Sequence, residues 1–120
     1  MNEPRILVAY DGSEEAYWAL MRAADAALAT GAAIGIVTVL PKLATAAADG
    51  AAILREHDLE AAVHTPIGDP ATEIARVARD YAYDAIYVGR REEGSLARVL
   101  EGSVSDGVVQ ASGRTTVIAR

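Results

Sequence analysis

Glycine and serine residues in the last third of the chain are spaced as in a loop that could hold a phosphate group. Gly89 follows an apolar run, and Gly102 and Ser103 precede a predicted helix. Small residues before a helix let backbone N–H groups approach an anion, and the helix N-terminus adds positive potential there. Glu92 stands where a third glycine would complete this cradle. The segment therefore predicts a nucleotide pocket and partly contradicts it.

Arginine supplies nearly all of the positive charge, and Arg90, Arg91 and Arg98 lie in this same segment. The formal net charge of the chain is −6, which disfavours binding to nucleic acids and anionic membranes. Local arginines on an acidic protein suit a small anionic ligand better than a polyanion. An ordinary solvated surface explains these arginines equally well.

The elements expected to position these residues alternate between strand and helix. Apolar runs predict strands over 6–10, 34–40, 59–65, 84–89 and 115–119. Helical spacing and cap residues predict helices from Ser13 to near Gly31, over 44–57, from Asp69-Pro70 onward, and from near Val104. The expected fold is α/β: a doubly wound five-stranded parallel sheet in the order 3-2-1-4-5, with helices on both faces. Residues 1–120 are expected to form one domain.

Helical periodicity also predicts which side chains face the interior. In the first helix the predicted buried stripe comprises Tyr17, Leu20, Met21, Ala24 and Leu28. In the third it comprises Ile74, Val77, Ala78 and Tyr81. Gly50 interrupts the alanine-rich second helix and weakens that prediction.

The expected strand order places the ligand site. Ligands of doubly wound sheets bind beyond the carboxyl ends of the strands at the point where the strand order reverses. Here that point lies between the first and fourth strands, which end at Asp11 and Gly89. We therefore expect these two residues to line one crevice, although Asp11 could equally serve only the turn into the first helix.

Taken together, these residues resemble the universal stress protein family. The resemblance rests on segments spread over nearly the whole chain: Ile6–Ser13, Gly68–Ala71 with Glu73 and Ile74, Asp84–Arg91, Gly102–Ser105 and Thr116–Ile118. It implies a homodimer, a role in the stress response and, in one branch of the family, ATP bound through spaced glycines. The other branch lacks the glycines and is thought not to bind ATP. With Glu92, this sequence stands between the two.

Carried over residue by residue, the resemblance implies a nucleotide site. Asp11 would hold the ribose or adenine end, the backbone near Val39 would face adenine, and phosphates would lie at the glycines and serines. The implied binding residues are Ala9, Asp11, Val39, Gly89, Arg91, Glu92, Gly102, Ser103, Val104 and Ser105. The ligand would be ATP or AMP, with magnesium accompanying ATP, and turnover would be slight or absent.

Glu92 is expected to disfavour phosphates. Two unit charges ~4 Å apart cost about 1 kcal/mol in water and about 4 kcal/mol at an effective dielectric constant of about 20. AMP should therefore be penalised less than ATP. The alternative function is a homodimeric stress or interaction protein with a vestigial pocket.

The remaining expectations concern surroundings and partners. The chain has no cysteine, and no apolar run nears the ~20 residues of a membrane span, so we expect a cytoplasmic protein. His57 and His64 lack partners at metal-ligand spacing, which predicts surface positions and no metal. Trp18 is expected in packing or in a dimer contact. The apolar strand Thr115–Ala119 has no residue that would shield an edge, which predicts pairing with a second copy.

Overall fold

A computed structural model describes residues 4–40, 45–89, 96 and 115–119, the last range by its backbone alone. The strands are β1 (Arg5–Ala9), β2 (Ala33–Val37), β3 (Ala61–His64), β4 (Ala85–Gly89) and β5 (Thr115–Ala119), and the helices are α1 (Glu14–Thr30), α2 (Ala46–Glu56) and α3 (Pro70–Asp80). The strands form a parallel sheet in the order β3-β2-β1-β4-β5. The predicted parallel α/β fold, with β1 between β2 and β4, is therefore confirmed.

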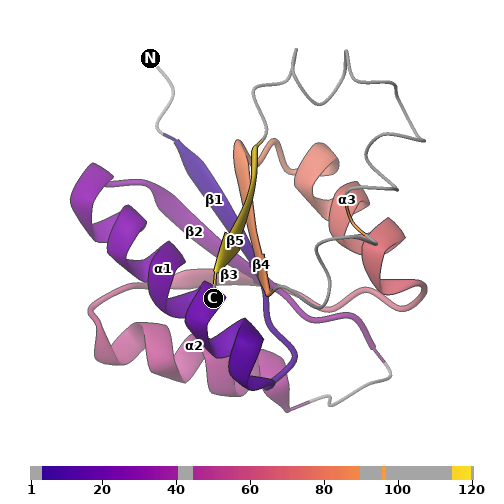
Figure 1. The fold of residues 1–120 in the computed structure, drawn as a ribbon, viewed down its shortest axis with the longest axis horizontal. Coiled ribbons are helices and arrows are strands. Elements are labelled where there is room, and N and C mark those ends of the chain that lie inside the picture. Colours follow the sequence, from indigo (N-terminus) through magenta and orange to yellow (C-terminus); the bar gives the residue numbers. More distant parts are fainter. Residues whose placement is uncertain (1–3, 41–44, 90–95, 97–114, 120) are drawn as a thin grey trace.

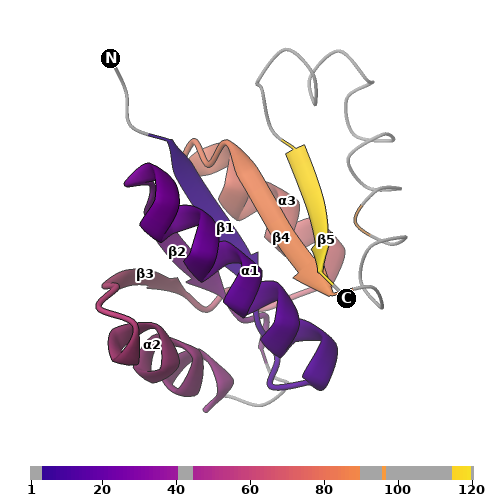
Figure 2. The same ribbon diagram turned by 60° about the vertical axis from the view of Figure 1, so that its left-hand side comes forward.

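The sheet separates two hydrophobic layers. In Figures 1 and 2, α1 and α2 lie on one face of the sheet and α3 on the other. Because side chains alternate along a strand, each strand supplies both layers. Within β1, Ile6 and Val8 pack with α1, while Leu7 and Ala9 pack with α3. This two-sided cover explains why β1 reads as a continuous apolar run rather than an alternating one.

The ends of α1 match the sequence prediction. Ser13 is the N-cap, and its hydroxyl oxygen accepts a hydrogen bond from the Ala16 N–H at 3.1 Å. Gly31 ends the helix in the left-handed region at φ 76°, where its N–H bonds to the Ala27 carbonyl. Both caps satisfy backbone groups that a helix end leaves unpaired.

The predicted buried stripe of α1 is partly wrong. Leu20 and Ala24 are buried, but Tyr17 and Leu28 are 37% and 55% exposed. The helix instead turns a band of small side chains to the sheet: Ala16, Ala19, Ala23, Ala24 and Ala27, with Leu20 among them. Alanines let the helix axis approach the strands closely, so the large apolar residues beside them remain at the surface.

Gly50 belongs to α2 despite its low helix propensity, because the helix needs a residue without a side chain at this point. A Cβ at Gly50 would lie 2.9 Å from the Tyr10 ring and 3.2 Å from the Ile36 side chain. The absence of that atom lets α2 rest against the ring of Tyr10. Tertiary packing thus overrides propensity here.

The start of α3 follows the predicted cap chemistry. Asp69 is the N-cap, Pro70 begins the helix, and the Asp69 carboxylate accepts hydrogen bonds from the N–H and hydroxyl of Thr72 at 3.1 and 2.8 Å. These bonds lower the pKa of Asp69. Ile74, Val77 and Ala78 are buried as predicted, but Tyr81 is 52% exposed, because the helix ends at Asp80.

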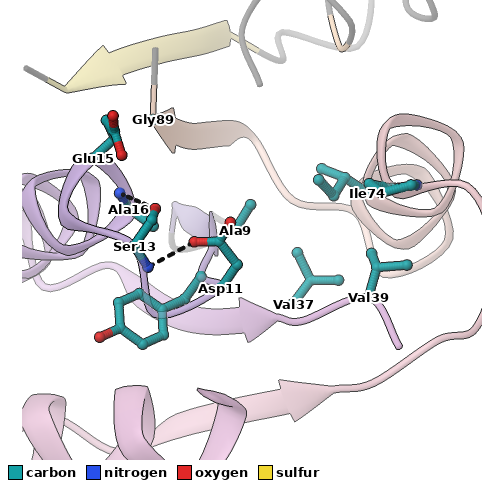
Figure 3. A pocket seen from close by; sticks show the side chains of 11 residues that line it. Ala9, Asp11, Ser13, Glu15, Ala16, Val37, Val39, Ile74 and Gly89 are labelled. Carbon is teal, nitrogen blue, oxygen red and sulfur yellow. Dashed lines mark hydrogen bonds between the residues drawn. The ribbon is translucent and has the colours of Figure 1, made fainter. Parts of the chain in front are cut away.

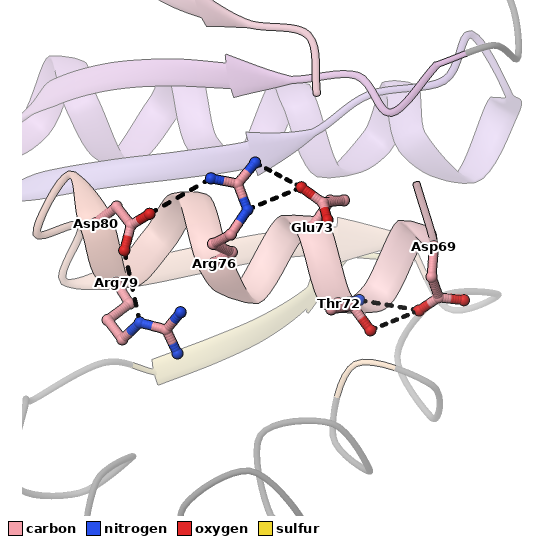
Figure 4. A network of polar contacts seen from close by, with 6 residues as sticks. All are labelled: Asp69, Thr72, Glu73, Arg76, Arg79 and Asp80. Carbon is pink, nitrogen blue, oxygen red and sulfur yellow. Dashed lines mark hydrogen bonds and ion pairs between the residues drawn. The ribbon is translucent and has the colours of Figure 1, made fainter. Parts of the chain in front are cut away.

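Figure 4 shows the polar side chains that continue along α3. Arg76 bonds to Glu73, with Nε to Oε1 at 2.9 Å, and pairs with Asp80 at 3.4 Å. Arg79 lies 3.6 Å from the same Asp80 carboxylate. Arg76, Arg79 and Asp80 are about half exposed, and ion pairs between such side chains contribute little to stability. Glu73 is more covered, with its side chain 16% exposed.

The second and third strands are shorter than predicted. β2 ends at Val37 rather than Leu40, although an isolated bridge still joins Leu40 to Ile67. β3 spans Ala61–His64 and lies at the edge of the sheet, as its weak hydrophobicity suggested. The predicted helix from near Val104 lies outside the described residues.

Candidate functional site

Asp11 and Gly89 line one pocket at the carboxyl edge of the sheet, as the strand order predicted. Its empty space, counted together with the solvent at its open mouth, amounts to about 520 Å³. Figure 3 shows Asp11 beyond the end of β1, Gly89 at the end of β4, and Val39 and Ile74 on the other side. The lining residues are Ala9, Tyr10, Asp11, Ser13, Glu15, Ala16, Val37, Val39, Pro70, Ile74 and Gly89.

A turn held by Asp11 and Ser13 forms one wall. Oδ1 of Asp11 accepts a hydrogen bond from the Ser13 N–H at 2.9 Å, and Ser13 then caps α1. The carboxylate is therefore fixed in place at the rim of the pocket. Such a group can accept hydrogen bonds from hydroxyl groups of a ligand.

Gly89 brings β4 against the first turn of α1. A Cβ on Gly89 would lie 2.8 Å from Cβ of Glu15 and 3.0 Å from its carbonyl carbon. Part of that conflict is with backbone, which cannot rotate away, so only glycine fits without a shift. Glu15 thereby comes into the lining, close to the point where the predicted phosphate loop begins.

The opposite wall is apolar. Val37 and Val39 come from the end of β2 and the segment after it, and Pro70 and Ile74 from the first turns of α3. Aliphatic surfaces with a few fixed polar groups are typical of small-molecule sites. This wall suits the face of a planar base.

The backbone of Tyr10 is hydrogen-bonded to the end of β2 and to the residue that follows it, while its ring packs against α2. The ring lies against Gly50 of α2, and burial, followed by the nearby Asp49, Asp11 and Tyr17, raises the pKa of Tyr10. The Tyr10 carbonyl accepts a hydrogen bond from the buried Thr38 hydroxyl at 2.7 Å, and its N–H bonds to the Val37 carbonyl at 3.0 Å.

The predicted site residues fall into two groups. Ala9, Asp11, Val39 and Gly89 lie together around the pocket. The others lie outside the described residues: Arg91, Glu92, Gly102, Ser103, Val104 and Ser105.

Sequence reasoning did not place seven of the lining residues in the site: Tyr10, Ser13, Glu15, Ala16, Val37, Pro70 and Ile74. Two signals point to Glu15 and to the start of α3. Glu15 lies in the first turn after Asp11, and the Asp69-Pro70 helix start follows β3, whose carboxyl end meets the same edge of a parallel sheet.

The histidines lie away from this pocket. His57 is exposed, as predicted, and its Nδ1 lies 3.0 Å from the Ile53 carbonyl oxygen. His64 is half-buried rather than at the surface. Its Nε2 lies 2.9 Å from the Tyr83 hydroxyl oxygen, and its ring centroid lies 4.5 Å from that of Tyr81. Burial and then Arg5 lower the pKa of His64. Across the described part of the chain, no three metal-ligating side chains gather.

The helices of the described ranges do not include one that is long and apolar enough to cross a lipid bilayer. Trp18 is 45% exposed and makes an edge-on contact with Tyr17, at 5.4 Å between ring centroids. Trp18 thus packs against Tyr17 at the surface, and the alternative of a dimer contact stays a prediction.

Comparison with known families decides the family. The model of the universal stress protein family matches residues 4–64 and 50–120, which together span nearly the whole chain. The chain belongs to the universal stress protein family. Among curated proteins compared with this universal stress protein, none matches significantly.

Solved structures share its fold. A universal stress protein from Archaeoglobus fulgidus has a TM-score of 0.75 and 23% identity, covering 100% of this chain and 96% of that one. The structure of the universal stress protein from the same organism in complex with dAMP has a TM-score of 0.73 and 20% identity, covering 99% and 98%. A universal stress protein in complex with cAMP has a TM-score of 0.75 and 21% identity, covering 100% and 98%.

Proposed function

We propose that this universal stress protein binds an adenine nucleotide in the crevice between β1 and β4, with little or no turnover. The observation that carries the proposal is the convergence of Asp11, Gly89 and an apolar wall around one pocket. Universal stress proteins of the same fold have been crystallised with dAMP and with cAMP, both adenine nucleotides.

The lining suggests how such a ligand would lie. The aliphatic wall of Val37, Val39 and Ile74 would cover the base, and the Asp11 carboxylate would accept hydrogen bonds from ribose hydroxyls. Phosphates would extend toward Gly89 and the segment 90–105 that follows it. That segment carries Arg91, Gly102, Ser103, Val104 and Ser105, which we propose as the phosphate contacts, and Glu92, whose carboxylate would lie beside the phosphates and repel them.

The proposal of little turnover rests on the pocket's chemistry. Among its described lining residues, the hydroxyl of Ser13 is engaged in capping α1, and no histidine is present to activate it. Hydrolysis needs an activated nucleophile or a positioned water, and the Ser13 hydroxyl that caps α1 is not an activated nucleophile.

Partners and setting extend the proposal. We propose that residues 1–120 act as one domain, that two copies pair through β5 (Thr115–Ala119), and that the protein works in the cytoplasm. β5 stands at the edge of the sheet order, which leaves one side of its backbone open to a partner strand.

The test is nucleotide titration by calorimetry, with ATP and AMP, on nucleotide-free protein. We expect AMP to bind more tightly than ATP, and Glu92→Gly to improve ATP binding selectively. Asp11→Asn keeps an oxygen that can accept the Ser13 N–H but removes the charge, and should weaken AMP binding about tenfold. Asp25→Asn, on the exposed face of α1, is the matched control and should bind as wild type.

Each outcome separates the alternatives. If wild type binds neither nucleotide and Glu92→Gly restores ATP binding, the pocket is vestigial and the alternative function holds. ATP binding much more tightly than AMP would contradict the expected role of Glu92.

A further inference from the structure

Thr38 is a polar residue buried within the fold, at 2% exposure. It follows the last residue of β2 and lies in the chain between Val37 and Val39, which both line the pocket, although Thr38 itself does not. A valine of the same shape would suit such a buried position without the cost of burying a hydroxyl group. The hydroxyl therefore needs a reason beyond packing.

Its contacts supply one. The Thr38 hydroxyl donates to the Tyr10 carbonyl at 2.7 Å, and the Thr38 N–H donates to the His64 carbonyl at 3.0 Å. The Tyr10 N–H in turn bonds to Val37 at 3.0 Å. The backbone of Tyr10 is thus held at both its polar groups, one of them by a side chain.

The bond acts at the point where β1 gives way to the site. Tyr10 directly precedes Asp11, whose carboxylate accepts the Ser13 N–H and so sets the turn into α1. Beyond Ala9 the β1 backbone has left the regular strand ladder. The hydroxyl therefore fixes the direction in which the chain leaves the sheet.

We propose that Thr38 is a positioning residue for the pocket: through the Tyr10 carbonyl, its hydroxyl fixes the Asp11 carboxylate relative to the Val37–Val39 wall. This inference rests on the proposed nucleotide site for its effect on binding. Its geometric part concerns only the turn, which can be measured without a ligand.

The experiment compares Thr38→Val, which removes the hydroxyl at constant shape, with Thr38→Ser, which keeps it. In the full chain, amide hydrogen exchange at Ser13 reports the Asp11 turn, and calorimetry reports AMP affinity. Thr38→Val should speed Ser13 exchange and weaken AMP binding about threefold to tenfold. Thr38→Ser should restore both to near wild type. Should Thr38→Val fail to fold, Thr38→Ala takes its place.

A double-mutant cycle distinguishes positioning from general stabilisation. If Thr38 acts through Asp11, Thr38→Val should weaken AMP binding far less in an Asp11→Ala background than in wild type. Equal losses in both backgrounds would overturn the inference, as would unchanged Ser13 exchange in Thr38→Val. If wild type binds no nucleotide, the proposed function fails, and the Ser13 exchange alone then supports or overturns the positioning role.

Discussion

The two faces of the sheet achieve close packing in opposite ways. On the face covered by α1, the helix contributes the small side chains: its alanines contact the larger aliphatic side chains of β1 and β2. On the face covered by α3, a strand contributes the small residue instead: Gly35 of β2 has no side chain and leaves room for the buried ring of Tyr83. The difference teaches that close contact needs one small partner, and that either element can supply it.

The Tyr83 side of this comparison also carries polar contacts. The Tyr83 hydroxyl meets Nε2 of His64 at 2.9 Å, and the Arg5 guanidinium carbon lies 4.8 Å from the centre of the Tyr83 ring. The guanidinium Nε of Arg5 donates to the Tyr81 carbonyl at 3.0 Å, and the backbone N–H of Arg5 donates to Oδ2 of Asp84 at 2.8 Å.

The largest expected effect comes from removing Leu20, the one large side chain among the buried residues of α1. Leu20 is fully buried among alanines that cannot move to fill a cavity, so Leu20→Ala should lower the free energy of unfolding by about 2–5 kcal/mol. Leu28→Ala, at a 55% exposed position on the same helix, should change it by no more than about 0.5 kcal/mol. Urea unfolding measures both, and equal losses would refute this account of which face is buried.

A smaller effect is expected on the α3 face. A Cβ at Gly35 would lie 2.7 Å from Cζ of Tyr83, so Gly35→Ala should destabilise the protein by about 1–3 kcal/mol. Gly31→Ala is the control: it strains the backbone at a φ of 76°, but the added Cβ would meet no atom within 4 Å. Only Gly35→Ala should also shift the NMR signals of the His64 ring, and unmoved signals would argue against the Tyr83 contact.

The smallest effect is a pH dependence confined to the same face. Because the pKa of His64 lies below its ordinary value of 6.5, the unfolded chain binds a proton there more readily than the folded protein. The contribution of His64 to the free energy of unfolding is therefore highest above pH ~6.5, where His64 is neutral in both states, and it decreases as the pH falls toward the lowered pKa. Between pH 7.5 and 5, the free energy of unfolding measured with urea should depend less steeply on pH in His64→Gln than in wild type. An identical slope would remove His64 from the account.

Local chemistry was predictable where it acts over a few residues. Ser13, Gly31 and Asp69-Pro70 cap their helices as expected, because capping depends on nearby backbone groups alone. The meeting of Asp11 and Gly89 was also predictable, because parallel strands joined by right-handed crossovers leave few possible orders.

The predictions that were wrong or missing concern how closely two elements approach each other. Tyr17 and Leu28 were expected to be buried because they are large and apolar, but the alanines of α1 determine how close the helix lies to the sheet. Gly35 and Gly50 make sense only once the Tyr83 and Tyr10 rings are placed. Glu15 enters the pocket only because Gly89 lets β4 reach α1. Sequence periodicity reports none of these approaches.

The central place of β1 has a consequence for biosynthesis. Of the five strands, β1 precedes the others in the chain, and its neighbour β2 follows soon afterward, but its other neighbour, β4, begins only at Ala85. At roughly 5–20 residues per second, translation takes on the order of 4–15 s to span that interval. Until β4 is made, β1 lacks one of its two neighbours, and the unpaired edge of an apolar strand can pair with another polypeptide.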